Sequence, residues 1–405
     1  MRVSVEKAQQ LLLEHMAMPV ENEMIALAAS LGRVTGTDIE APYQLPLFDK
    51  SPLDGYAMRA EDIQKATVNT PVWLDVIEEY RAGYAPKKIV TKGTASKLMT
   101  GAPMPQGADV VIKYEDIERI KSQIKVSYSL KKNSNVIFAG EDIKRGDCIL
   151  KAGEIMTAAK IGALASVGIH QLPVRRKIKV ALLTTGDELI DASIELSEGK
   201  IFNSNLPTLY AATEKLGAQV TFADCVGDNK SKILEKLKLA IEQADIVITT
   251  GGVSVGDYDF IPDCLKEIGA EILFHGVSLK PGSPAIAAKL NDKIILGLSG
   301  NAAAAGITFQ LLAIPLLKKM MGLKNYLFVS TKATLMSDFS KKSPQRRFLR
   351  GKFVIDDKNK IALTGSQSNG AIQSMIDCNA LIDIPAGSDK LYTGQEVCVI
   401  LTGEL

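Results

Sequence analysis

The chain has 405 residues, which is too long for one hydrophobic core and indicates about two to four domains. Hydrophobic residues make up 46% and charged residues 23%, as in an ordinary soluble globular protein. The net charge of +2, without a long basic block, argues against nucleic acid as the main partner, and we find no run of about 18 apolar residues that would span a membrane.

The first third of the chain mixes helical and β patterns. Residues 4–17 predict a helix with Ser4 as its N-cap, and the proline-rich stretch 41–60 predicts a loop. Between about 70 and 150, short β-forming runs separated by Gly, Pro and Asn predict a small β-rich domain. Residues 154–168 predict a helix that ends at Gly168.

From residue 177 the pattern becomes a regular alternation of apolar strands and helices. Strands are predicted over 179–185, 219–226, 245–250, 271–277, 284–290 and 293–298, and helices over 206–217, 230–243, 258–269 and 302–322. This alternation predicts a doubly wound, mostly parallel sheet with helices on both faces. Residues 325–405 return to short β-runs, which fit either a small barrel or a sandwich.

Three loops rich in small residues follow strands of the predicted sheet. They are Gly186-Asp187-Glu188, the segment 251–257 (GGVSVGD) and the turn Ser299-Gly300-Asn301. Ligands of such sheets gather at the carboxyl ends of the strands, and glycine turns there let backbone N–H groups approach a phosphate. One such loop alone could be a solvent-exposed turn, but three on one sheet favour a phosphate-bearing ligand. The nucleotide motifs GxGxxG and GxxxxGK[ST] are not present.

Acidic residues accompany these loops and need a separate explanation. Asp187, Glu188, Asp228, Asp257 and Asp259 are all expected near the same cleft. Carboxylates repel a phosphate unless a hard cation lies between them, so Mg²⁺ is the expected mediator.

Several motifs resemble the MoeA/gephyrin family of molybdopterin molybdenumtransferases. In the predicted α/β region they are TTGDEL (184–189), FNSN (202–205), TTGGVSVGDYD (249–259), LKPGSP (279–284) and the SGN turn (299–301). Earlier in the chain they are LFDKSPLDGYAMR (47–59), LMTGAPMPQGAD (98–109) and AGEDI (139–143). The resemblance extends over nearly the whole chain in the same order.

The resemblance implies a multidomain α/β protein. A helical linker region would comprise residues 1–42 and 143–176, a β-rich lid domain 43–142, a MogA-like α/β domain 177–324, and a β-barrel-like domain 325–405. It further implies insertion of molybdate into adenylylated molybdopterin with release of AMP, assisted by Mg²⁺. A homodimer, with a molybdopterin adenylyltransferase as upstream partner, is also implied. Five scattered cysteines without a CxxC fit reduced thiols and a cytoplasmic location.

The resemblance also assigns site residues by position. Catalytic roles are implied for Asp54, Thr100, Asp142, Glu188, Asp228, Asp259 and Lys280, and metal binding for Glu188, Asp228, Asp257 and Asp259. Binding of the pterin nucleotide or oxyanion is implied for Thr185, Gly186, Asp187, Ser204, Thr250, Gly251, Gly252, Ser254, Gly256, Pro281, Gly282, Gly300, Asn301 and Arg350. The site would lie between the α/β domain of one subunit and the lid of the other.

Three of these residues have a simpler structural interpretation. Asp54 could merely cap the turn of its DGYA segment, and Lys280 could be an ordinary surface charge. Arg350 could be a solvated residue on an edge strand, because the RRFLR run alternates as such strands do.

The chain departs from the family pattern where positive charge is expected. Ile137 and Phe138 replace arginines before GEDI, Ser283 replaces a lysine, and Ala302 replaces the proline of a PGNP turn. In the tail, Asn369 stands in a turn that usually has a second small residue. These departures leave three hypotheses: an active molybdenumtransferase, a paralogue of the same fold with lost or altered insertion chemistry, and a non-enzymatic interaction module. The retained acids favour the first hypothesis, and the lost arginines favour the second.

Overall fold

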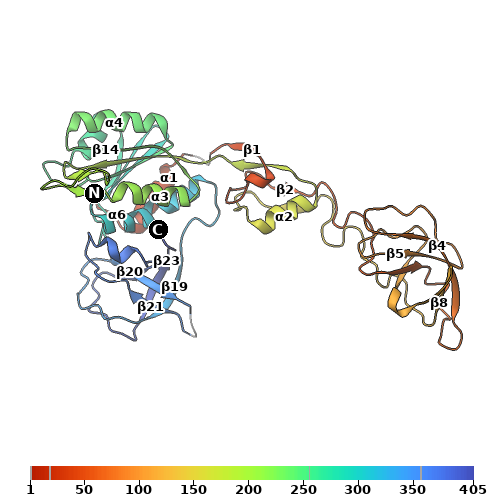
Figure 1. Cartoon of the computed structure of the whole chain (residues 1–405). Coiled ribbons are helices and arrows are strands. Elements are labelled where there is room, and N and C mark those ends of the chain that lie inside the picture. Colours follow the sequence, from red (N-terminus) through yellow and green to blue (C-terminus); the bar gives the residue numbers. More distant parts are fainter. Residues whose placement is uncertain (1, 18–19, 255, 356–357) are drawn as a thin grey trace.

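The computed structural model describes residues 2–17, 20–254, 256–355 and 358–405. The molecule is elongated: the α/β region and a C-terminal barrel lie together at one end, a narrow linker forms the middle, and a β-rich lid occupies the far end (Figure 1). The chain runs out to the lid and back, because the linker contains strands from both sides of it in the sequence. The exact domain boundaries given above stay predictions.

The first helix, α1 (Val5–His15), begins where the sequence predicts. The Ser4 hydroxyl accepts a hydrogen bond from the Lys7 N–H at 3.1 Å, as an N-cap should. The buried residues of α1, Val5, Ala8 and Leu12, belong to the hydrophobic core of the α/β region. This helix therefore packs against the α/β region and not on the linker elements that follow it in sequence.

The linker is built from two short antiparallel strand pairs and one helix. These elements are β1 (Asn22–Ala26) with β10 (Gln171–Arg175), β2 (Ile39–Glu40) with β9 (Cys148–Leu150), the 3-10 turn η1 (Leu27–Ala29) and α2 (Ala158–Ser166). Helix α2 was predicted from residue 154 but starts at Ala158, because Thr157 is its N-cap and accepts from the Lys160 N–H. Its end at Gly168, which has φ +82°, agrees with the prediction.

The lid is a six-stranded sheet with its own core. The strand order is β6-β3-β5-β4-β8-β7, and only the β4–β5 pair is parallel. The elements are β3 (Gly55–Met58), β4 (Val72–Tyr80), β5 (Thr94–Leu98), β6 (Val110–Lys113), η2 (Tyr114–Asp116), β7 (Glu118–Ile120) and β8 (Gln123–Val126). The lid thus confirms the β-rich pattern between residues 70 and 150.

The α/β region is the doubly wound sheet that the sequence predicts. The strand order is β14-β11-β15-β18-β17-β16; the first four strands are parallel, and β17 and β16 are antiparallel. The strands are β11 (Lys179–Thr185), β14 (Gln219–Val226), β15 (Ile246–Thr250), β16 (Glu271–His275), β17 (Ile286–Leu290) and β18 (Lys293–Leu298). A small parallel pair, β12 (Leu189–Ile190) and β13 (Ile201–Phe202), lies beside the sheet.

Alternate residues of β11 point into two cores, as a sheet covered on both faces requires. Val180 and Leu182 pack with α1, α3 (Asn205–Lys215) and the helix that begins at residue 302. Ala181 and Leu183 pack with α4 (Lys230–Gln243) and α5 (Ile261–Glu267). This alternation explains why the strand is an unbroken apolar run.

The helix at residues 302–320 consists of α6 (Ala302–Thr308), a π-helical turn η3 (Phe309–Ala313) and α7 (Ile314–Met320). Among the described residues it is the one helix that is long and apolar enough to cross a membrane by length and composition, with a mean hydropathy of 1.2. The sequence analysis overlooked this run, in which Thr308 and Gln310 interrupt the apolar residues. Because 89% of the window is buried inside the protein, the helix serves as a core helix.

The C-terminal region is a closed barrel, which resolves the choice between barrel and sandwich. The strand order is β19-β21-β20-β22-β23. The elements are β19 (Val329–Leu335), β20 (Arg347–Val354), β21 (Lys360–Leu363), η4 (Ile372–Met375), β22 (Ala380–Ile384) and β23 (Glu396–Leu401). The barrel docks on α6, where the Ala304 N–H donates to the Asn369 carbonyl at 3.2 Å. A methyl group added at Gly306 would lie 2.2 Å from Met375 Cε.

Candidate active site

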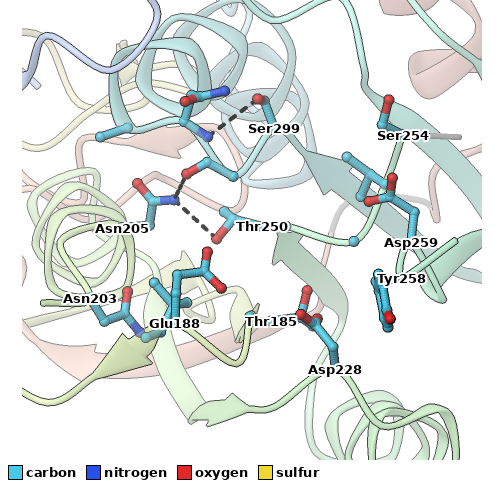
Figure 2. Close-up of a pocket in the computed structure, with 18 of the residues that line it drawn as sticks. Thr185, Glu188, Asn203, Asn205, Asp228, Thr250, Ser254, Tyr258, Asp259 and Ser299 are labelled. Atoms are coloured by element: carbon cyan, nitrogen blue, oxygen red, sulfur yellow. Dashed lines mark hydrogen bonds between the residues drawn. The ribbon is translucent and has the colours of Figure 1, made fainter. Parts of the chain in front are cut away.

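The three glycine-containing loops meet at the carboxyl edge of the sheet and enclose one cavity of about 670 Å³ (Figure 2). The predicted residues that line it are Thr185, Gly186, Glu188, Ser204, Asp228, Thr250, Gly251, Gly252, Ser254, Gly256, Asp257, Asp259, Gly300 and Asn301. The loops follow β11, β15 and β18, which are neighbours in the sheet, so parallel pairing alone brings them together. We call this cavity the acidic cavity.

Two consecutive glycines shape the central loop of the acidic cavity. Gly251 has φ +84° and Gly252 has φ +62°, a region that residues with a Cβ rarely adopt. A Cβ at Gly251 would lie 2.3 Å from the Thr185 carbonyl oxygen, which belongs to the neighbouring strand. The loop can therefore pass close to β11 only without side chains at these positions. The Thr185 hydroxyl beside it is buried and has no hydrogen-bond partner among the described residues.

Two asparagines of the FNSN segment form hydrogen bonds to the strand ends and a loop around the acidic cavity, and Figure 2 shows those of Asn205. The Asn205 amide donates to the Gly300 carbonyl at 2.7 Å and to the Thr250 hydroxyl at 3.4 Å. The Asn203 amide donates to the Thr184 hydroxyl at 2.8 Å. The sequence analysis selected only Ser204 from this segment. An amide at the start of α3 was the available signal, because an asparagine there can reach the ends of neighbouring strands.

Three carboxylates surround that of Asp228, which lines the acidic cavity. The N–H of Asp228 donates to Asp187 Oδ1 at 2.9 Å, and the N–H of Asp187 donates to Asp228 Oδ2 at 3.2 Å. Burial raises the pKa of Asp228, and the negative charges of Asp187, Glu188 and Asp259 raise it further, against the hydrogen bond from Asp187. The site therefore concentrates negative charge, and a bound cation would relieve it.

The carboxylates do not form a ready-made metal cage. Among the described residues no group of three or more Asp, Glu, His or Cys side chains is arranged to hold a metal ion. Carboxylate oxygens are nevertheless the ligands that Mg²⁺ prefers, and Mg²⁺ commonly takes one or two of them together with waters and substrate phosphates. The residues present thus fit a Mg²⁺ ion that binds together with a phosphate ligand.

A second cavity, of about 280 Å³, adjoins the first. The two share Pro284, Ser299 and Asn301 as walls. The second cavity is lined by Arg2, Leu279, Lys280, Pro281, Gly282, Ser283, Pro284, Ser299, Asn301, Gln345 and Asn369. None of these described lining residues carries a carboxylate, and two are cations, so we call it the basic cavity. Lys280 is exposed and lines this cavity, and its contact with a ligand stays a prediction.

Arg350 does not lie on an edge strand, so that part of the sequence analysis is wrong. Strand β20 is hydrogen-bonded to β21 on one side and to β22 on the other, and the Arg350 side chain is fully buried. Its guanidinium donates to the Ser374 hydroxyl and to the carbonyls of Ser366 and Ser368, at 2.6, 2.9 and 3.0 Å. Arg350 therefore holds the loop whose next residues, Asn369 and Gly370, line the basic and acidic cavities respectively.

Burial lowers the pKa of Arg350, although Cys378 opposes the shift. Its Nη1 atom is buried without a hydrogen-bond partner among the described residues. The expected direct grip of this guanidinium on an oxyanion stays a prediction.

None of the three predicted lid residues lines either cavity. Asp54 directly precedes β3 and Thr100 follows β5, both strands of the lid, which lies at the other end of the molecule from the α/β region (Figure 1). Asp54 accepts from the N–H and the hydroxyl of Thr100, at 2.6 and 2.8 Å, and these bonds lower the pKa of Asp54. The Asp54 carboxylate therefore bonds Thr100, which is 46 residues away in the sequence. Asp142 is exposed, and its backbone N–H donates to the Leu45 carbonyl.

Two exposed aromatic side chains in the wall of the acidic cavity were missed. Phe202, at the end of β13, is 46% exposed, and Tyr258 is 72% exposed (Figure 2 shows Tyr258 beside Asp228 and Asp259). Both lie inside motifs that the sequence analysis quoted. They were not selected, because that analysis looked for glycines and for polar or charged residues in the loops after strands. Together with Leu189, Ile201 and Val253, they give the acidic cavity apolar surfaces suited to a planar ring.

Comparison with known proteins agrees with this geometry over the whole chain. Residues 3–168 match a family model described as the MoeA N-terminal region (domain I and II). Residues 181–319 match the probable molybdopterin binding domain, and residues 332–402 match the MoeA C-terminal region (domain IV).

Named relatives cover the chain almost completely. A molybdopterin molybdenumtransferase of Staphylococcus epidermidis is 38% identical over 99% of this chain and 96% of its own length. The Staphylococcus aureus protein of the same name is 37% identical over 98% and 94%. The crystal structure of a molybdopterin biosynthesis MoeA protein from Pyrococcus horikosii is 32% identical, covers all of both chains and superposes with a TM-score of 0.89. The chain therefore belongs to the MoeA family, as the sequence resemblance predicts.

Proposed function

We propose that this protein is a molybdopterin molybdenumtransferase that inserts molybdate into adenylylated molybdopterin and releases AMP in a Mg²⁺-dependent reaction. The names of its relatives support the coarser part, a transferase of molybdenum cofactor biosynthesis. The observation that carries the finer part is the contact between the two cavities: an acidic one with glycine turns opens beside a basic one, and they share Ser299 and Asn301.

The acidic cavity suits the pterin nucleotide. Its volume of about 670 Å³ is within the roughly 300–1,000 Å³ that small-molecule sites occupy. The glycine turns offer backbone N–H groups to phosphate oxygens. Glu188, Asp228, Asp257 and Asp259 would hold Mg²⁺, which when bound neutralises phosphate charge.

The basic cavity suits molybdate, which enters as a substrate. Lys280 would hold the dianion as a point charge, and the hydroxyls of Ser283 and Ser299 would donate to its oxygens. Charge-assisted hydrogen bonds of this kind contribute about 1.5–3 kcal/mol each. The acids stay on the other side of the shared wall, so the oxyanion avoids their repulsion while it lies next to the pterin.

A second subunit would complete the site. Asp54, Thr100 and Asp142 are remote from both cavities within one chain, so they can serve the reaction only from a partner copy (Figure 1). We therefore propose a homodimer in which each lid covers the cavities of the other chain. A molybdopterin adenylyltransferase as supplier of the substrate, a cytoplasmic location and independence of nucleic acid and membranes complete the proposal.

The main alternative is a same-fold paralogue that binds the pterin nucleotide but has lost or altered molybdate insertion. Ile137 and the 40% exposed Phe138 present apolar surface beside Asp142 where the family resemblance implies arginines. This substitution favours the alternative, because a lid without those charges holds a dianion less firmly.

The test is to follow AMP release from adenylylated molybdopterin by the purified protein, with Mg²⁺ and increasing molybdate. We expect saturable, molybdate-dependent release that Lys280→Ala lowers by about tenfold or more, the loss of one charge-assisted contact. Lys238→Ala, which removes an exposed lysine from α4, is the matched control and should behave as the wild type. Tight pterin binding by the wild type without any AMP release would instead establish the paralogue.

A further inference from the structure

The start of the chain docks beside the basic cavity. The N–H of Val3 donates to the Gly276 carbonyl at 3.1 Å, and the N–H of Ser278 donates to the Val3 carbonyl at 2.7 Å. Val3 thus forms a parallel bridge with Val277, between β16 and the LKPGSP segment. This backbone pairing brings Arg2 to the wall of the cavity that Lys280 also lines, although the two residues are far apart in sequence.

The Arg2 side chain lies across a glycine. A Cβ built at Gly276 would be 3.4 Å from Arg2 Nε and 3.5 Å from Arg2 Cγ, so the stem of Arg2 lies against this position. Gly276 has φ +98° and gives Arg2 a flat surface to cross. Arg2 reaches the basic cavity in this way and becomes one of its two cationic lining residues.

The neighbouring arginines are already engaged, whereas Arg2 is not. Arg346 donates to both carboxylate oxygens of Asp383, at 2.8 and 2.7 Å, and also pairs with Glu6. Arg347 donates to the Ser343 hydroxyl and lies over the Phe339 ring. Within the described part of the chain, no ion pair or side-chain hydrogen bond occupies the guanidinium of Arg2 or the ammonium of Lys280.

We propose that Arg2 is a second oxyanion-binding residue of the basic cavity and holds, together with Lys280, the tetrahedral dianion that enters the reaction. This inference rests on the proposed function. Two monovalent cations on one acid-free cavity match a doubly charged oxyanion, and the planar guanidinium can donate two parallel hydrogen bonds to it. Arg2 supplies positive charge at a cavity where Ser283 is neutral.

The test measures the KM for molybdate in AMP release and, separately, molybdate binding to the protein by isothermal titration calorimetry. We expect Arg2→Gln to raise both the Kd and the KM about three- to tenfold with little change in kcat, because one exposed charge-assisted contact is lost. Arg2→Lys should lie between Arg2→Gln and the wild type. Arg145→Gln, which removes an exposed arginine of the linker, should leave both values unchanged.

The double variant Arg2→Gln/Lys280→Ala separates shared binding from unrelated effects. If both residues hold one anion, the loss in the double variant is not the sum of the two single losses. A wild-type Kd for Arg2→Gln, with a raised Kd for Lys280→Ala, overturns the role of Arg2 and leaves the proposed function intact. Failure of the wild type to bind molybdate at all contradicts the proposed function itself.

Discussion

At the scale of single residues, the central loop of the acidic cavity needs glycine at Gly251, because a side chain there would collide with the neighbouring strand. Gly251 approaches the Thr185 carbonyl so closely that a Cβ there would stand 2.3 Å from the oxygen. The position also has φ +84°, which alone disfavours any other residue. The cost of the steric contact can be separated from the cost of the backbone conformation by comparison with Gly269. That glycine has a similar φ of +76°, but no atom lies within 4 Å of its Cβ position.

We expect Gly269→Ala to cost only about 1–2 kcal/mol, the penalty of the left-handed conformation. Gly251→Ala should cost about 1–3 kcal/mol more, because its methyl group forces the loop away from β11. Native-state hydrogen exchange of the β15 amides measures the difference, and AMP release should fall only in Gly251→Ala. Equal protection of these amides from hydrogen exchange in both variants would show that the loop accommodates the methyl group at residue 251 without an additional loss of stability.

Arg350 marks the limit of residue-level prediction from sequence. The alternation of RRFLR identifies a strand but does not tell which neighbours the strand has, since strand order is set by tertiary contacts. Only the structure shows that β20 has a partner on each side and that the guanidinium holds the loop at residues 366–368.

At the scale of elements, a charged brace joins the linker to the sheet. Arg176, which follows β10, donates to both oxygens of Asp245, at 2.7 and 3.0 Å, directly before β15. Burial raises the pKa of Asp245, but the hydrogen bonds from Arg176 and from the Lys179 N–H outweigh it, so the pKa is lowered overall. The ionised form therefore stabilises the fold above the pKa of about 3.9 that the unfolded chain has.

We expect Asp245→Asn to lower the stability of the α/β region at pH 7 by about 1.5–3 kcal/mol, the contribution of charge-assisted hydrogen bonds. The stabilisation is lost as the pH falls through the lowered pKa, so the wild type and the variant should converge in acid. Calorimetric unfolding between pH 3 and 7 measures this. Asp263→Asn, which removes an exposed partner of Lys266, is the control and should change stability by less than about 0.5 kcal/mol. A difference in unfolding free energy between wild type and Asp245→Asn that stayed constant across this pH range would contradict a stabilising role of the ionised Asp245.

Elements with strong local signals could be predicted, and those set by tertiary context could not. The span of α4 and the Ser4 cap of α1 follow from periodicity and capping chemistry, and the structure confirms both. The start of α2 was wrong by a turn, because Thr157 rather than residue 154 supplies the cap. Strand β21 and the π-helical turn η3 were not predicted at all. The convergence of the three glycine loops was predicted correctly, since parallel strands end at one edge of the sheet. The basic cavity was not predicted, because one of its two cationic lining residues, Arg2, comes from the first residues of the chain.

At the scale of the whole molecule, elongation places the lid far from both cavities of the same chain, although the proposed reaction uses residues of both. The lid lies at the opposite end from the cavities (Figure 1), so Asp54 and Lys280 of one chain cannot meet. The proposed two-fold dimer would bring each lid to the cavities of the other chain, because its single interface is symmetric and gives both chains the same environment.

The proposed dimer predicts complementation between inactive variants. Mixed dimers of Asp54→Ala and Lys280→Ala chains contain one intact site, so random mixing should restore about a quarter of wild-type AMP release. Asp228→Ala mixed with Lys280→Ala is the matched control: both changes affect the same face of a chain, so each site stays damaged and no activity returns. Absence of recovery in the first mixture, with mixed dimers verified by differently tagged chains, would refute the shared site.

Glycine at Gly306 allows the barrel to pack closely on α6, at a position that lines neither the acidic nor the basic cavity. Met375 of the barrel region occupies the place that a methyl group at Gly306 would take, and the same region carries Asn369 and Gly370 to the cavity walls. The position of these two wall residues therefore depends on how closely the barrel packs on α6 at Gly306, which itself lines neither cavity. Substitutions at the contact between Gly306 and Met375 would therefore change the fit of a substrate without changing any residue that lines the two cavities.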